Sequence, residues 1–216
     1  MDFGRVLKEV VGAMETAGLR YALIGGFAMS LRRVQRATAD LDFILALEDL
    51  ETLDALLERF GYRRVFRSEN VSHYDAADSA WGRIDILHAF RKPSLGMLQR
   101  AEPVEVEPGF RIRVARVEDI IGLKVQAMSN NPARTESDVH DIRLLVRAAR
   151  EQGSALDWEL LRAANSRPTP GSPGRENEPP RRRLLTPREY IEIATFASRL
   201  DRSRKSIDFS GTNWKL

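Results

Sequence analysis

The chain has 216 residues, of which 43% are hydrophobic, enough for a packed core in one ordinary domain with an appendage. It contains no cysteine, which excludes disulfides and thiolate zinc sites, and its three histidines, His73, His88 and His140, do not have the spacing of metal ligands. The net charge of +3 is uneven, because residues 166–216 hold 11 of the 34 basic but only 6 of the 31 acidic residues. The remainder is therefore not a basic domain overall, and charge supports a nucleic-acid partner only weakly.

Helical and strand patterns alternate along the chain. Apolar residues recur at helical spacing from Phe3 to Met14, and this helix is expected to end at Gly18. The further elements expected, in chain order, are a strand at 21–24, a short helix from 26 to about 33, a strand at 41–45, a helix at 49–60, strands at 62–66, 71–74 and 83–87, a hairpin of strands at 104–106 and 110–114, and helices from 117 to about 165. No apolar run approaches the ~20 residues of a membrane span and the N-terminus lacks a signal-peptide core, so we expect a cytoplasmic protein with no membrane partner.

Residues 166–185 interrupt this order. They contain five of the ten prolines and three consecutive arginines without apolar periodicity, a composition typical of a flexible linker. A helix signal follows, with Thr186 as N-cap, Pro187 at the first helical position and a capping Glu189. Because a lone amphipathic helix is marginal in water, residues 186–216 either complete the fold or serve as a docking segment, on the chain's own domain or on a second copy.

The most informative pattern joins Gly25-Gly26 to Asp40-Leu41-Asp42. The glycines follow an apolar strand and precede a short helix, where backbone without a Cβ and free N–H groups favours phosphate. Asp40 and Asp42 are two apart on the next strand, so both side chains point to one face, while Leu41 points to the core. Two adjacent carboxylates repel unless a cation or proton lies between them, and such oxygen ligands suit Mg²⁺ together with substrate phosphates. This combination indicates nucleotidyl or phosphoryl transfer.

A third carboxylate is expected from a later strand. Asp85 lies between Ile84 and Ile86, and if both isoleucines face the core, Asp85 faces the other carboxylates. The alternative interpretation is an ordinary strand aspartate, exposed or paired with Arg83. Three further residues near the carboxylates, Ser30, Arg36 and Thr38, are candidate phosphate contacts or ordinary surface residues.

The glycine pair, the spacer and the Asp-x-Asp sequence resemble the nucleotidyltransferase superfamily of DNA polymerase β. Residues 117–145 are similar to the helical lysine motif, here with Lys124, and to the Arg/Lys-Asp-x-x-Asp-Ile motif, here at Asp138 and Asp141, of AbiEii-type nucleotidyltransferases. These are toxin components of bacterial toxin–antitoxin and abortive-infection systems. The resemblance covers about residues 3–150.

The resemblance implies specific roles. Lys124 would contact the triphosphate and Asp141 would line the active site, with Asp138 on the same helix face. Without it, Lys124 is a lysine extending from a buried helix face and the aspartates are helix-capping or ion-pairing residues. Asp40, Asp42 and Asp85 would hold two Mg²⁺ ions, and Gly25 and Gly26 would bind a nucleoside triphosphate (NTP) such as ATP.

We therefore expect an α+β protein with the nucleotidyltransferase fold, a mixed sheet flanked by helices with a helical C-terminal subdomain. Residues 1–115 would form the catalytic domain and 116–165 the helical subdomain, followed by the linker at 166–185 and the docking segment at 186–216. By resemblance the acceptor is tRNA or protein and the partner a cognate antitoxin. The alternatives are an aminoglycoside- or lincosamide-type antibiotic nucleotidyltransferase and a catalytically inactive binding module.

Overall fold

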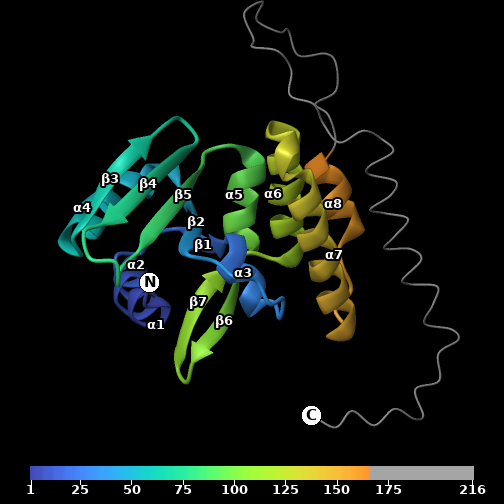
Figure 1. The fold of residues 1–216 in the computed structure, drawn as a ribbon, viewed down its shortest axis with the longest axis horizontal. Helices are drawn as coiled ribbons and strands as arrows, with labels where there is room; N and C mark the ends of the chain where they lie inside the picture. Colours follow the sequence, from blue (N-terminus) through green and yellow to red (C-terminus); the bar gives the residue numbers. More distant parts are fainter. Residues whose placement is uncertain (166–216) are drawn as a thin grey trace, which may run out of the picture.

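Seven strands form one mixed sheet in the computed structural model, which describes residues 1–165 (Figure 1). The linker expected at 166–185 and the helix expected at 186–216 lie outside the described residues. The elements in chain order are α1 (Phe3–Val6), a π-type turn (Leu7–Val11), α2 (Gly12–Thr16), β1 (Tyr21–Ile24), α3 (Gly25–Leu31), β2 (Asp40–Ala46), a 3-10 turn (Leu47–Asp49), α4 (Leu50–Arg59), β3 (Tyr62–Arg67), β4 (Val71–Ala76), β5 (Arg83–Ala89), α5 (Lys92–Arg100), β6 (Glu102–Glu107), β7 (Phe110–Val114), α6 (Val117–Asn130), a 3-10 turn (Pro132–Arg134), α7 (Thr135–Glu151) and α8 (Trp158–Asn165).

The sheet has the order β3-β4-β5-β2-β1-β7-β6, with β2 at its centre. The β2–β5 and β1–β7 pairs are parallel and the other neighbours are antiparallel, so the expected mixed sheet is confirmed. Strand β2 pairs with β5 along its whole length, from Asp40 opposite Arg83 to Ala46 opposite Ala89. This register determines which side chains of the two strands lie next to each other.

One face of the sheet packs on the N-terminal helices and α4. Leu41 and Phe43 of β2 and their partners Ile84 and Ile86 of β5 are almost completely buried. On the same face, Tyr74 of β4 donates a 2.5 Å hydrogen bond to Asp54 of α4. Each fully buried aliphatic or aromatic side chain contributes roughly 1.5–3 kcal/mol. The alternation of strand residues therefore directs these four apolar side chains to the covered face and the neighbouring aspartates to the opposite one.

Helix α5, Lys92–Arg100, was not predicted from the sequence. Its segment is short and contains Gly96, and only Met97 and Leu98 are buried, so it has little apolar periodicity. The available signal was Pro93 in the first turn, a position that proline favours. Tertiary packing against β2, β5 and β1 supplies the stability that the local sequence lacks.

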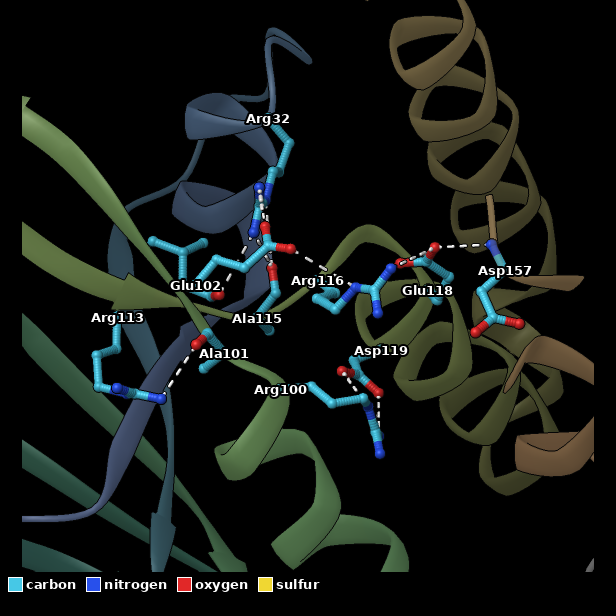
Figure 2. A network of polar contacts seen from close by, with 11 residues as sticks. Arg32, Arg100, Ala101, Glu102, Arg113, Ala115, Arg116, Glu118, Asp119 and Asp157 are labelled. Atoms are coloured by element: carbon cyan, nitrogen blue, oxygen red, sulfur yellow. Dashed lines mark hydrogen bonds and ion pairs between the residues drawn. The ribbon is translucent and has the colours of Figure 1, made fainter. Parts of the chain in front are cut away.

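A network of ion pairs joins the sheet to the helices that follow it (Figure 2). Glu118, at the start of α6, accepts a hydrogen bond of 3.4 Å from the side chain of Arg116. It also accepts one of 2.9 Å from the backbone N–H of Asp157, the residue before α8. Arg32, after α3, donates to the backbone oxygen of Ala115 at 2.9 Å. Glu118 is buried, so its charge depends on these partners. The network therefore fixes α6 relative to α3 and the sheet.

Helices α6, α7 and α8 pack together beside the sheet (Figure 1). No helix in the described part of the chain is long and apolar enough to cross a bilayer.

Candidate active site

The three aspartates singled out in the sequence lie on one face of adjacent strands. Asp42 of β2 is directly opposite Asp85 of β5, and residues paired in register point to the same side of a sheet. Asp40 is two residues before Asp42 and therefore on that side as well. All three side chains are partly buried. The expected position of Asp85 next to the other two is thus observed.

The turn from β1 to α3 lies against Asp42. Gly25 has φ +68°, and a Cβ at this position would lie 2.0 Å from Oδ2 of Asp42. A Cβ at Gly26 would lie 2.9 Å from Cβ of Thr38. Only glycine is compatible with both the left-handed conformation and the close approach at residue 25. The glycine pair therefore brings bare backbone to the carboxylates.

The environment of Asp42 favours its neutral form. Burial, followed by the charges of Asp40 and Asp85, raises its pKa to about 6, although the backbone N–H of Gly26 and the charge of Arg134 act in the opposite direction. A carboxyl held between like charges in a partly buried position is a site that a bound cation would stabilise.

Hydrogen bonds already occupy some of the carboxylate oxygens. Thr38 donates to Oδ1 of Asp40 at 2.9 Å, which orients that carboxylate. Oδ1 of Asp85 is bound by Nε of Arg83 at 2.8 Å and lies 2.7 Å from Nδ1 of His73. The ion pair with Arg83 that the sequence left open as an alternative is therefore present.

Within the described residues, no group of three or more His, Asp or Glu side chains has the arrangement of a preformed metal site. The donor set still fits Mg²⁺, which commonly binds through one or two carboxylates and completes its shell with water and substrate phosphates. Asp40 and Asp42 supply such a pair. Asp85 fits as a third donor through Oδ2, since Oδ1 carries its contacts with Arg83 and His73.

Lys124 of α6 lies in a buried ion cluster with two aspartates of α7. Its Nζ is 2.6 Å from Oδ2 of Asp141 and 3.1 Å from Oδ1 of Asp138. Arg36 lies 3.5 Å from Asp141 and Arg134 lies 3.2 Å from Asp138. Both aspartates are at most 1% exposed, and one oxygen of each has no hydrogen-bond partner. The lysine is thus held by carboxylates in this structure.

The remaining predicted residues lie between the glycine turn and this cluster. The side chain of Arg36 approaches Gly26 and also contacts Asp141, so it connects the two parts of the site. Ser30 donates weak hydrogen bonds of 3.3 and 3.4 Å to the backbone oxygens of Gly26 and Arg36. An open cavity of about 640 Å³ is lined by Ser30, Arg33, Gln35, Arg36 and Ala37. The carboxylates themselves do not line it.

His73 is a residue at this site that the sequence did not indicate. The sequence showed only that it lacks the spacing of a metal ligand, and on β4 it lies opposite Asp85 and contacts its carboxylate. The strand alternation was the available signal, but the register between β4 and β5 cannot be read from one sequence.

Comparison with known structures gives nucleotidyltransferase folds. The solution structure of the antibiotic-resistance factor ANT(2'')-Ia has a TM-score of 0.56 and 16% identity, covering 95% of this chain and 100% of that one. A crystal structure of ANT(2'')-Ia in complex with adenylyl-2''-tobramycin has a TM-score of 0.56 and 19% identity, covering 74% of this chain and 94% of that one. An antigenic nucleotidyltransferase-like protein from Paracoccidioides brasiliensis has a TM-score of 0.50 and 17% identity, covering 94% and 89%. At these identities the likeness shows the fold alone.

Comparison with curated protein sequences gives no match. The family model described as "Nucleotidyl transferase AbiEii toxin, Type IV TA system" matches residues 12–212, which is most of the chain. The matched range includes the glycine turn, all three aspartates and the Lys124 cluster. The chain therefore belongs to the AbiEii nucleotidyltransferase toxin family.

Proposed function

We propose that this nucleotidyltransferase transfers a nucleoside monophosphate from an NTP to an acceptor hydroxyl in a reaction that requires Mg²⁺. The observation that carries the proposal is the position of Asp42, in register with Asp85 and in contact with the Gly25 turn. One place thus provides ligands for a cation and bare backbone for phosphates.

Asp40 and Asp42 would hold the metal, with Asp85 as a third ligand. Two bound Mg²⁺ ions would offset the charge of the triphosphate and lower the pKa of the acceptor hydroxyl. Oδ2 of Asp85 would accept the proton of that hydroxyl, while Arg83 and His73 hold its Oδ1 in place. The raised pKa of Asp42 implies that a cation has to displace a proton from this residue at slightly acidic pH.

The triphosphate would lie along the Gly25–Gly26 turn, with Ser30, Thr38 and Arg36 beside it. The acceptor oxygen attacks the α-phosphorus, the bond to the bridging oxygen breaks, and pyrophosphate leaves with its charge balanced by backbone N–H groups and cations. Lys124 is the proposed cation for the leaving group. A triphosphate would compete with Asp138 and Asp141 for its Nζ, so Asp141 would act by holding Lys124 and Arg36 in position.

The acceptor is proposed to be tRNA or protein, as expected for a toxin-type enzyme, with a cognate antitoxin as partner. In this proposal residues 1–115 form the catalytic domain and 116–165 complete the active site from α6 and α7. Residues 186–216 would dock on the catalytic domain. Their removal together with the linker should change activity or solubility if the segment is regulatory.

A second candidate is nucleotide transfer to an aminoglycoside or lincosamide antibiotic. The fold similarity to ANT(2'')-Ia favours it, as does the slight excess of acidic residues in 1–165, which suits a cationic drug. The acceptor distinguishes this candidate from the first.

The test supplies each α-labelled NTP with Mg²⁺ to the full chain, together with total cellular RNA, protein extract or aminoglycosides. We expect label in RNA or protein, and none with Asp42→Asn. Glu51→Gln, which changes an exposed carboxylate on α4, is the matched control and should behave as wild type. Full transfer by Asp42→Asn would contradict the proposal, and labelled aminoglycoside would establish the second candidate.

A further inference from the structure

An aromatic pair extends the carboxylate site toward the edge of the sheet. Phe66 of β3 lies opposite His73 of β4, and His73 lies opposite Asp85 of β5, which lies opposite Asp42. Residues paired in this way share one face, so these four side chains form a row across four strands. At ~4.8 Å per strand, Phe66 lies about 14 Å from Asp42. The row connects the candidate metal site to edge strand β3.

The outer end of this row presents flat ring surface to solvent. Phe66 is 49% exposed, and its ring stacks on that of His73 with centroids 5.2 Å apart and planes inclined by 26°. His73 is oriented in turn by its contact with Asp85. A bulge between Arg64 and Phe66 produces this alignment, because it shifts the register of β3 by one residue. An ordered, half-exposed aromatic stack is a surface on which a planar ligand can stack.

Basic side chains flank the stack. Arg63 of β3 is exposed and forms no ion pair with any side chain that the structure describes, and its partner Asp75 is two residues from His73, which places Arg63 on the face of the stack. Arg83 of β5 is partly exposed on the same face and pairs with Asp85. Asp75 is the acidic residue among them, opposite Arg63. This combination attracts an anionic ligand with aromatic groups and disfavours a polycationic drug.

The direction of the reaction separates the two ends of the site. In phosphoryl and nucleotidyl transfer, the attacking and leaving oxygens lie roughly in line on opposite sides of the phosphorus. The Gly25–Gly26 turn, proposed to bind the triphosphate, lies on the β1 side of Asp42, while β5, β4 and β3 lie on the other side. If pyrophosphate leaves toward α3, the acceptor has to approach from the β5–β3 side.

We infer that the Phe66–His73 pair is the acceptor-side stacking site, and that it binds an unpaired base near the end of a polynucleotide acceptor. This inference rests on the proposed function and selects RNA over protein. The distance to Asp42 places the stacked base one or more nucleotides away from the nucleotide whose hydroxyl reacts. Arg63 contacts a phosphate of the same strand, which contributes affinity without sequence preference.

The first test measures binding without catalysis. The full chain is titrated onto a single-stranded RNA oligonucleotide labelled at its 5′ end, and fluorescence anisotropy gives the Kd. Phe66→Leu removes one base–aromatic stack, so its Kd should be about tenfold higher than that of wild type. Phe66→Trp keeps an aromatic ring at this position and should have wild-type affinity. Val65→Ala is the matched control, since Val65 is its equally exposed neighbour in β3, and should leave the Kd unchanged. An unchanged Kd for Phe66→Leu would overturn the inference.

The second test separates this inference from the proposed function. With α-labelled NTP, Phe66→Leu should raise the KM for RNA about tenfold and leave the KM for NTP unchanged. If wild type labels RNA and Phe66→Leu has the same KM for RNA, the stacking site is wrong and the proposed transfer stands. If wild type labels protein or an aminoglycoside instead, the polynucleotide acceptor is wrong. If wild type labels none of them, the proposed function itself fails.

Discussion

Replacing Asp42 by asparagine should stabilise the protein without ligands and abolish its activity. Asp42 lies beside Asp40 and Asp85 in a partly buried position, so its ionised form is unfavourable in the folded protein. Asparagine has nearly the same shape and no charge. The substitution therefore removes the repulsion among the three carboxylates, and with it a charged ligand that the proposed metal site requires.

The magnitude follows from the pKa of Asp42, which is raised from 3.8 to about 6 in the folded protein, chiefly by burial. A shift of about two pKa units corresponds to about 3 kcal/mol. Because the folded state binds this proton more tightly, the contribution of Asp42 is fully present below pH 3.8 and is lost as the pH rises through about 6. Asp42→Asn should thus match wild type at pH 3.5 and exceed its stability by about 3 kcal/mol above pH 7.

Urea unfolding of both proteins between pH 3.5 and 8, without divalent cations, measures this difference. In thermal unfolding it corresponds to roughly 6–12 °C for a chain of this size. Glu51→Gln provides the control, because an exposed carboxylate should give a small difference that does not follow this pH profile. Equal stability of Asp42→Asn and wild type at pH 8, or a gain of the same size at pH 3.5, would refute the reasoning.

Three further substitutions test other parts of the site. Gly25→Ala should cost about 2 kcal/mol or more in urea unfolding and lose transfer activity, because its Cβ would meet Asp42. Gly18→Ala, at a position with the same φ but open space, should cost only about 1 kcal/mol. Equal costs would contradict the close approach of Gly25 to Asp42. Lys124→Met should lower the free energy of unfolding by about 3 kcal/mol, because it removes the cation shared by the buried Asp138 and Asp141, and adding Asp141→Asn should recover part of this loss. An unchanged melting temperature would show that the cluster is not stabilising. Glu118→Ala should cost about 1–3 kcal/mol, since it leaves the backbone N–H of Asp157 without its partner and removes one of the two carboxylates that contact Arg116. A neutral result in thermal unfolding would argue against this network.

The arrangement of the glycine turn and the aspartates was predictable because it depends on local sequence. Strand alternation assigned Asp42 and Asp85 to one face, and the apolar neighbours of both are buried as expected. The order strand, glycine pair, helix and strand also gave the correct class of fold. These features depend on periods of two and 3.6 residues, which a single sequence displays directly.

Features that depend on pairing between distant segments were not predictable. The contact of His73 with Asp85 requires the register of β4 on β5, and the stack with Phe66 requires a bulge that shifts the register of β3. The contacts of Lys124 with Asp138 and Asp141 likewise require the packing of α6 on α7. Helix α5 depends on tertiary packing for the same reason.

Asp40, Asp42 and Asp85 are proposed to bind divalent cations beside an NTP on the Gly25 turn. A crystal structure of the full chain with Mn²⁺ and a non-transferable NTP analogue would locate both ligands. We expect anomalous density at metal–oxygen distances of about 2.1 Å from Asp40 and Asp42, with the triphosphate against Gly25–Gly26. Metal or triphosphate bound elsewhere, with Asp42 making no contact to either, would contradict it.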